Sequence, residues 1–246
     1  DVPKVVKDTK KSEEEVARNL RYEALKNYKN QIGANAIAVA HHKEDQGETI
    51  IHRFLRGTGG LGLIGMTYKT EDLIRPLLDF SKEDLIAFVK SKHYGHVTDE
   101  SNTNTKYTRN KIRHSLIPYL EENFNPNLTN NLVRMSRILS EDESYMESEA
   151  LKAYNDVSVM TQDATLNSVM TQGNVLNSVV KQDVTLNIEK LSEYPKAIIR
   201  RVIRRAIERY KGDLKNIEYA HIERIIQLLN QQSGKCVTLC EDIVVL

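Results

Sequence analysis

The sequence predicts an α/β fold, because a helix, a buried strand and a second helix follow one another near its start. Ser12 and Glu15 form a capping box, and the apolar residues after them recur at helical spacing, which predicts a helix over residues 13–30. Residues 36–40 are wholly apolar and bounded by polar residues, as in a strand buried on both faces of a parallel sheet. Residues 44–56 form the predicted second helix.

A glycine-rich stretch, residues 57–66, follows this second helix and indicates a close backbone path. Ser81 and Asp84 then mark the start of another helix. Its apolar stripe consists of Leu85, Ile86, Phe88 and Val89. Residues 98–113 are polar and rich in turn residues, and a further helix is predicted after them.

A long helix and a repeat divide the second half of the chain. Apolar residues at helical spacing predict a helix from Asn127 to about Asn155, which could bridge two domains. Residues 161–188 repeat with a period of ten, and we interpret them as an insertion, with short strands as the alternative. The chain ends in helices and a predicted strand pair. The expected parts are an α/β domain (1–125), a linking helix (126–156), the repeat-containing insertion (157–187) and a small α+β domain (188–246).

The composition leaves the partner open. Lys and Arg (35) almost balance Asp and Glu (34), so any affinity for nucleic acid must come from local patches of charge. No signal peptide and no apolar run long enough to cross a bilayer is visible, and we expect a cytoplasmic protein without membrane contact. Cys236 and Cys240 are too few for a disulfide framework or a four-cysteine zinc site.

The densest polar cluster, residues 41–49, lies where the predicted buried strand gives way to a helix, the edge at which open α/β sheets bind ligands. Asp45 and Glu48 are three residues apart and share a helix face. They could coordinate Mg²⁺, with Asp45 as the metal ligand, or hold an ammonium group; acidic residues in a first turn also simply offset the helix dipole. His41 and His42 are candidate zinc ligands, although further ligands at the usual spacing are missing.

Two arginine pairs are candidate phosphate ligands. Arg109 and Arg113 are four residues apart and would share one side of a helix, where they could clamp phosphate oxygens or make surface ion pairs. Arg18 and Arg21 raise the same alternatives on the first helix.

A basic helix is predicted near the C-terminus. The run 196–211 has seven basic residues against Glu208 alone, and its apolar residues can face a core. We interpret the outward side as a contact for RNA phosphates, with a solvated basic face as the alternative. The arginines expected on this side are Arg200, Arg201, Arg204 and Arg205.

Six segments, in this order over about 100 residues, resemble the tRNA(Ile)-lysidine synthetases: residues 16–22, 41–49, 55–66, 75–78, 99–102 and 108–114. The resemblance implies a nucleotide α-hydrolase-like parallel-sheet domain, a helical linker and a smaller C-terminal domain that helps to hold tRNA. It also implies a reaction in which ATP adenylates the C2 oxygen of the wobble cytidine of an isoleucine tRNA with a CAU anticodon. Free L-lysine then displaces AMP to form lysidine, and Mg²⁺ assists. Related enzymes are often dimers, so a homodimer is one assembly that the resemblance suggests.

The resemblance also assigns candidate site residues. Asp45 and Glu48 fall on acidic positions tied to catalysis or lysine recognition, and Arg21 and Arg113 on basic positions near the phosphates and the activated cytidine. The further residues expected at the substrate and phosphates are Arg18, His41, His42, Gln46, Arg109 and Asn110. Arg56 is expected to contact RNA with the arginines of the basic helix.

One departure affects the prediction. Such families carry a Ser-Gly-Gly-x-Asp-Ser loop after the first strand, and nothing in this sequence matches it. We therefore expect the α/β domain to be incomplete at its N-terminus, and this chain alone to bind ATP weakly or not at all and to be inactive. The rival interpretations are a tRNA thiolation enzyme of the same superfamily and a noncatalytic tRNA-binding module.

Overall fold

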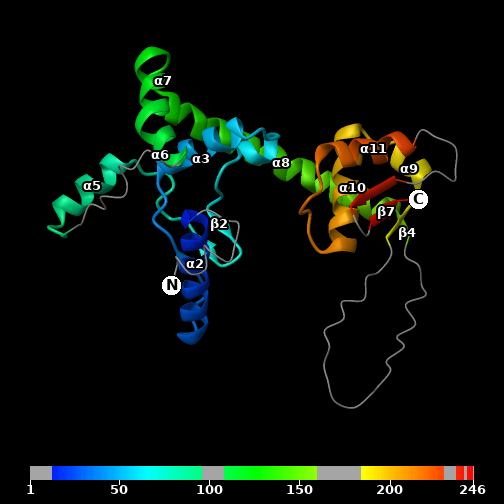
Figure 1. Cartoon of the computed structure of the whole chain (residues 1–246), viewed down its shortest axis with the longest axis horizontal. Helices are drawn as coiled ribbons and strands as arrows, with labels where there is room; N and C mark the ends of the chain where they lie inside the picture. The colour runs from blue at the N-terminus through cyan, green and yellow to red at the C-terminus, as the bar shows by residue number, and fades with distance from the viewer. Residues whose placement is uncertain (1–12, 96–107, 160–183, 230–236, 241–242, 246) are drawn as a thin grey trace. The chain divides into compact units, whose positions relative to one another are not determined.

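The computed structural model describes residues 13–95, 108–159, 184–229, 237–240 and 243–245 (Figure 1). The chain divides into two compact units, Asp1–Glu141 and Asp142–Leu246. The long helix α8 (Leu128–Val157) runs through this boundary, which falls inside the predicted linking helix. No helix in the described ranges is long and apolar enough to cross a membrane.

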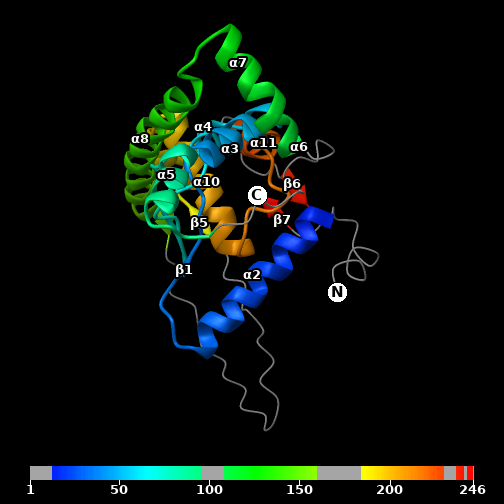
Figure 2. The same cartoon turned by 90° about the vertical axis from the view of Figure 1, so that its left-hand side faces the viewer.

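The first unit is mostly helical around a small sheet. Its helices are α2 (Glu13–Gln31), α3 (Lys43–Leu55), α4 (Gly60–Leu63), α5 (Lys82–Ser91), α6 (Thr108–Lys111), a π-helical turn η2 (Ile112–Leu116), α7 (Ile117–Asn123) and the start of α8. Its strands are β1 (Ile37–Ala38), β2 (Lys69–Thr70) and β3 (Leu73–Ile74). Strand β3 lies in the middle, parallel to β1 and antiparallel to β2. Figure 2 shows α2 leading into β1 and α3 following it.

Three expectations for this unit need correction. The strand predicted over 36–40 is shorter and is not buried on both faces, because Ile37 is buried while Ala38 is exposed. The turn-rich segment is helical from Thr108 onward, and residues 96–107 lie outside the described part. Ser81 does cap α5, accepting a hydrogen bond from the Asp84 backbone N–H at 3.0 Å, yet no residue of the apolar stripe on α5 is buried.

The core of the first unit decides where the later helices lie on α3. Ile51 packs with Ile112 and Ile117, and Leu116, Leu128 and Leu132 surround them. These contacts hold η2 and the start of α7 against α3. One helical face of α6 and η2 is therefore turned toward the first turns of α3.

Gln46 fastens the glycine-rich turn to α3. Its amide Nε2 donates to the carbonyl oxygens of Ile64 and Met66, both at 3.0 Å, and to Ser136 Oγ at 3.2 Å. Its Oε1 accepts from the Met66 N–H at 2.7 Å. Arg53 adds a second link by donating to the carbonyl of Gly65 at 2.7 Å. Backbone N–H and C=O groups of this turn are thus hydrogen-bonded to a side-chain amide and a guanidinium, instead of to other backbone groups of a helix or sheet.

The second unit consists of helices and two small strand pairs. Its helices are the end of α8, α9 (Ile188–Ser192), α10 (Lys196–Lys211) and α11 (Tyr219–Leu229). Its strand pairs are β4 (Ser158–Val159) with β5 (Thr185–Leu186), and β6 (Val237–Cys240) with β7 (Ile243–Val245), both antiparallel. The predicted C-terminal strand pair is confirmed. The period-ten repeat lies mainly in residues 160–183, outside the described part, between β4 and β5.

One apolar core joins the helices of the second unit. It contains Ala153, Tyr154 and Val157 from α8, Leu191 from α9, and the buried sides of α10 and α11 centred on Val202 and Ile222. Helix α10 has its apolar residues on one side, as its sequence predicts. Gly212 ends it with a φ of 89°, a left-handed conformation that favours glycine.

Ion pairs hold α10 to α8 on one flank of the basic side. Arg201 donates to Glu143 through Nε at 3.2 Å and Nη2 at 2.5 Å, and Arg205 pairs with Glu147. The two arginines and the two glutamates are each four residues apart, so successive turns of the helices are matched in charge. Both arginines lie on the polar side of α10 and are partly exposed, at 24% and 31%, but carboxylates of α8 engage them.

A substitution at Gly65 tests the attachment of the glycine-rich turn. Its φ is +70°, and an added Cβ would lie 2.7 Å from Gln46 Oε1. We expect Gly65→Ala to lower the free energy of unfolding by roughly 1–3 kcal/mol, because it adds left-handed strain and a clash with a fully bonded amide. Denaturant unfolding measures this change. Gly59→Ala is the control, since its φ is −80° and no atom lies within 4 Å of its Cβ position. Equal loss in both variants would contradict the role of Gln46.

A double-mutant cycle tests the pairing of α10 with α8. Arg201→Gln, Glu143→Gln and the double variant should give a coupling of about 1 kcal/mol in unfolding free energy, because the pair is bidentate and partly buried. Arg209→Gln, an exposed position on the same helix, should change stability by less than about 0.5 kcal/mol. Zero coupling would show that the pair contributes nothing to the packing of α10.

Candidate active site

Two buried carboxylates lie in the first turns of α3. The backbone N–H of His42 donates to Asp45 Oδ2 at 3.0 Å, which fixes Asp45 at the start of the helix. Glu48 follows one turn later on the same face. The side chain of Asp45 is 10% exposed and that of Glu48 only 1%. A buried carboxylate requires a charged or hydrogen-bonding partner, since its desolvation is costly.

Two arginines from the neighbouring helical segment supply these partners. Arg113 donates from Nε to Glu48 Oε1 at 2.5 Å, and from Nη2 to Glu48 Oε2 at 2.9 Å and to Asp45 Oδ1 at 2.8 Å. Arg109 donates from Nε to Glu48 Oε2 at 2.8 Å and from Nη2 to Asp45 Oδ1 at 3.0 Å. The four groups, here named the carboxylate–arginine cluster, balance in charge.

The cluster has an inner and an outer layer. The arginine side chains are 29% (Arg109) and 26% (Arg113) exposed, so the guanidinium groups cover the carboxylates on the solvent side. Burial lowers the pKa of Arg113, but the Glu48 and Asp45 carboxylates outweigh it and leave that pKa above its usual value. A ligand that approaches the cluster therefore meets fixed, positively charged donors first.

The two histidines before α3 lie in different surroundings. Burial lowers the pKa of His41, and the positive charges of Arg18 and Arg109 lower it further against the opposing effect of Asp45. His41 is therefore neutral at pH 7. His42 Nδ1 lies 2.8 Å from Glu44 Oε2. Burial raises the pKa of Glu44, but hydrogen bonds from His42 and from backbone N–H groups, including that of Lys82, leave it below its usual value.

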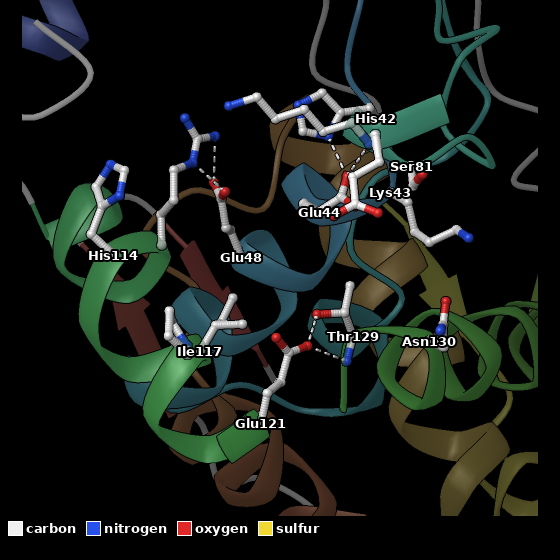
Figure 3. Close-up of a pocket in the computed structure, with 14 residues that line it drawn as sticks. His42, Lys43, Glu44, Glu48, Ser81, His114, Ile117, Glu121, Thr129 and Asn130 are labelled. Carbon is white, nitrogen blue, oxygen red and sulfur yellow. Dashed lines mark hydrogen bonds and ion pairs between the residues drawn. The ribbon is translucent and has the colours of Figure 1, made fainter. Parts of the chain in front are cut away.

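A pocket of about 620 Å³ opens beside the cluster (Figure 3). Glu48 and Glu44 project from α3 toward it, and Glu121 lies on the side of α7, bonded to Thr129. Its basic lining residues are His42, Lys43, Lys82, Arg113 and His114. Its acidic lining residues are Glu44, Glu48, Glu83 and Glu121. The pocket can therefore receive a polar ligand that carries both charges.

The structure brings together only part of the predicted site. Asp45, Glu48, Arg109 and Arg113 meet, and Arg18 lies close enough to influence His41. Asn110 is half-buried on α6 between the two arginines. Arg21 is exposed on α2 and Arg56 is exposed at the end of α3, and neither side chain has a hydrogen bond or ion pair among the described residues. The side-chain amide of Gln46 is hydrogen-bonded to the glycine-rich turn and does not take part in the cluster.

Several residues at the site escaped the sequence reasoning. Glu44 lies within the polar cluster of residues 41–49 but was not predicted as a site residue. Its carboxylate links α3 to α5 by accepting a hydrogen bond from the Lys82 N–H at 3.0 Å. Arg75 is buried and donates to the Thr67 carbonyl at 2.8 Å. The only sequence signal for it is its place in segment 75–78, which resembles the family. No signal in the sequence shows that Lys82 would line the pocket, because its place there depends on how α5 packs in the tertiary structure.

The carboxylates do not fit the predicted Mg²⁺ ligand role of Asp45. Its Oδ1 accepts from both arginines, and its Oδ2 accepts from the His42 N–H, so no oxygen faces outward unpaired. Across the described ranges, no group of three or more His, Cys, Asp or Glu residues is arranged to hold a metal ion. We therefore assign no step to a metal on these residues.

Two family models match segments of this chain. A PP-loop domain model matches residues 1–120, and a TilS substrate binding domain model matches residues 186–245. The first match covers the carboxylate–arginine cluster, and the second covers α10 and α11. The first unit thus contains a segment that matches a PP-loop domain, and the second contains a segment that matches the TilS substrate binding domain.

Related proteins match between about half of this chain and nearly all of it. A tRNA(Ile)-lysidine synthase from Caldanaerobacter subterraneus is 32% identical over 97% of this chain and 47% of its own length. One from Clostridioides difficile is 36% identical over 99% of this chain and 49% of its own length. One from Thermotoga maritima is 44% identical over 55% of this chain and 32% of its own length. The chain spans about half the length of the first two relatives. It belongs to the tRNA(Ile)-lysidine synthase family.

Proposed function

We propose that this chain carries part of the catalytic centre of an enzyme that ligates lysine to C2 of the wobble cytidine in an isoleucine tRNA with a CAU anticodon. ATP is the cosubstrate, and the product is lysidine. The observation that supports this function is the carboxylate–arginine cluster beside a charged pocket, within the segment matched by the PP-loop domain model.

The arginines suit the first step. The cytidine O2 attacks the α-phosphorus of ATP, pyrophosphate leaves, and negative charge develops on the phosphoryl oxygens. Arg109 and Arg113 present guanidinium N–H groups outward while Glu48 holds both from below. Donors that are fixed before the reaction stabilise the transition state without reorganising. Glu48 is therefore a positioning residue, because both of its carboxylate oxygens are bonded to the arginines and its side chain is only 1% exposed.

Asp45 suits the second step. The lysine ε-nitrogen forms a bond to C2, the C2–O bond to the adenylate breaks, AMP leaves, and the amine loses a proton. Asp45 is the more exposed carboxylate of the cluster. An entering ammonium group can replace one of the two guanidinium bonds on its Oδ1, and the carboxylate can then accept the proton. His41, neutral and nearby, is a second acceptor.

The rival functions find less support. A thiolation enzyme would need cysteines at the reacting centre, whereas Cys236 and Cys240 both belong to the second unit. A noncatalytic tRNA-binding module would have no need to bury two carboxylates under two arginines, an arrangement that costs desolvation energy.

A graft tests the catalytic role of the cluster. Residues 1–246 replace the matching segment of the Caldanaerobacter relative, and labelled lysine is incorporated into the tRNA in the presence of ATP. We expect the graft to be active, and Glu48→Gln to lower kcat by roughly 100-fold, because the guanidinium groups lose their fixed position. Glu122→Gln, an exposed position on α7, is the matched control and should be unchanged. A folded graft without activity would contradict the proposed function.

A second variant separates lysine recognition from adenylation. Asp45→Asn keeps an oxygen acceptor for the His42 N–H but removes the negative charge. Loss of one charged hydrogen bond should raise the KM for lysine about tenfold or more, while the KM for ATP stays within about twofold. Steady-state kinetics with lysine and ATP varied in turn measure both values. If both values rise together, Asp45 supports the cluster as a whole and does not recognise lysine.

A further inference from the structure

Tyr219 presents an aromatic ring at the surface of the second unit. It opens α11 and is 66% exposed. Helix α10 packs beside α11 (Figure 1), and the guanidinium Cζ of Arg200 lies 5.5 Å from the ring centroid. Arg200 Nη2 also donates to the Tyr219 hydroxyl at 3.3 Å. The guanidinium lies over the ring and is bonded to its hydroxyl, and two thirds of the residue remains exposed to solvent.

Arg200 is itself held in position. Its Nε donates to Glu223 Oε1 at 2.6 Å, and Glu223 stands one turn after Tyr219 on the same side of α11. The Glu223 carboxylate raises the pKa of Arg200 by hydrogen bonding and charge. The ring, the guanidinium and the carboxylate therefore form a fixed unit, which lowers the entropy cost of placing a planar ligand on the ring.

Cations continue on the same side of α10. Lys196, Arg200 and Arg204 are spaced four residues apart, so they form one row along the helix. Among the described residues, Arg204 forms no ion pair, and Lys196 forms none but lies near enough to Glu223 for its charge to help lower the pKa of that carboxyl. Arg201 and Arg205, in contrast, are directed to the carboxylates of α8. Lys196 and Arg204 thus lie on the flank of α10 that adjoins Tyr219, and the arginines paired with α8 lie on the other.

We propose that Tyr219, backed by Arg200, is a stacking platform for an unpaired RNA base, with Lys196 and Arg204 contacting the neighbouring phosphates. An aromatic face beside a row of cations is how proteins hold single-stranded nucleotides, because each base offers a π-face and each linkage a negative charge. A fully paired helix would offer phosphates but no free base. The inference rests on the proposed function, which makes tRNA the partner.

The test measures binding of the intact chain to an unmodified isoleucine tRNA transcript by fluorescence anisotropy. Tyr219→Ala should weaken binding roughly 5- to 100-fold, the usual range for loss of one stacked base. Tyr219→Phe keeps the ring and should stay within about twofold of the unsubstituted chain. Tyr145→Ala is the matched control, because Tyr145 is also 66% exposed but lies among acidic residues of α8. Thermal unfolding checks that each variant is folded.

Two further measurements distinguish stacking from a charge effect. The slope of log binding constant against log salt should stay unchanged in Tyr219→Ala and fall by about one in Arg204→Gln, since only the latter loses a phosphate contact. A blunt RNA duplex should bind Tyr219→Ala and the unsubstituted chain equally. If Tyr219→Ala binds tRNA as tightly as Tyr145→Ala does, the platform is refuted while tRNA binding stands. If the unsubstituted chain does not bind tRNA, the proposed partner itself is refuted.

Discussion

The first unit depends on the burial of Glu48. An ionised carboxylate that is 1% exposed would cost several kcal/mol without a partner, so a guanidinium must lie against α3. Arg113 and Arg109 meet this requirement only when α6 and η2 pack where Ile112 and Ile51 hold them. The apolar contact and the ion pairs thus fix the same arrangement, and that arrangement places Arg113 in the lining of a pocket.

The same residue type has a different role in the second unit. Arg201 and Arg205 neutralise carboxylates of α8 and help to pack α10, whereas Arg204 lies on the other flank without an ion-pair partner in the described part. A basic helix is therefore not a uniform RNA-binding surface. The flank facing α11 adjoins the exposed Tyr219 and lies in the segment that matches the TilS substrate binding domain model.

Much of the site was accessible from the sequence. The pairing of Asp45 with Glu48 and of Arg109 with Arg113 follows from helical spacing, and the segments that resemble the family placed both pairs at one site. Spacing could not show that the arginines would pair with the carboxylates, or that both oxygens of Asp45 would already accept hydrogen bonds. Those facts depend on contacts between residues more than 60 positions apart.

The sequence by itself determined the local elements: the helix at Glu13, the Ser81 cap, the long α8 and the C-terminal strand pair. These depend on capping and on apolar periodicity within a few residues, which a sequence displays directly. The tertiary structure alone decided which charged groups are neutralised, that Gln46 serves the glycine-rich turn, and that the apolar residues of α5 lack a buried contact. Burial and ion pairing are set by the distances between elements, and no local pattern specifies those distances.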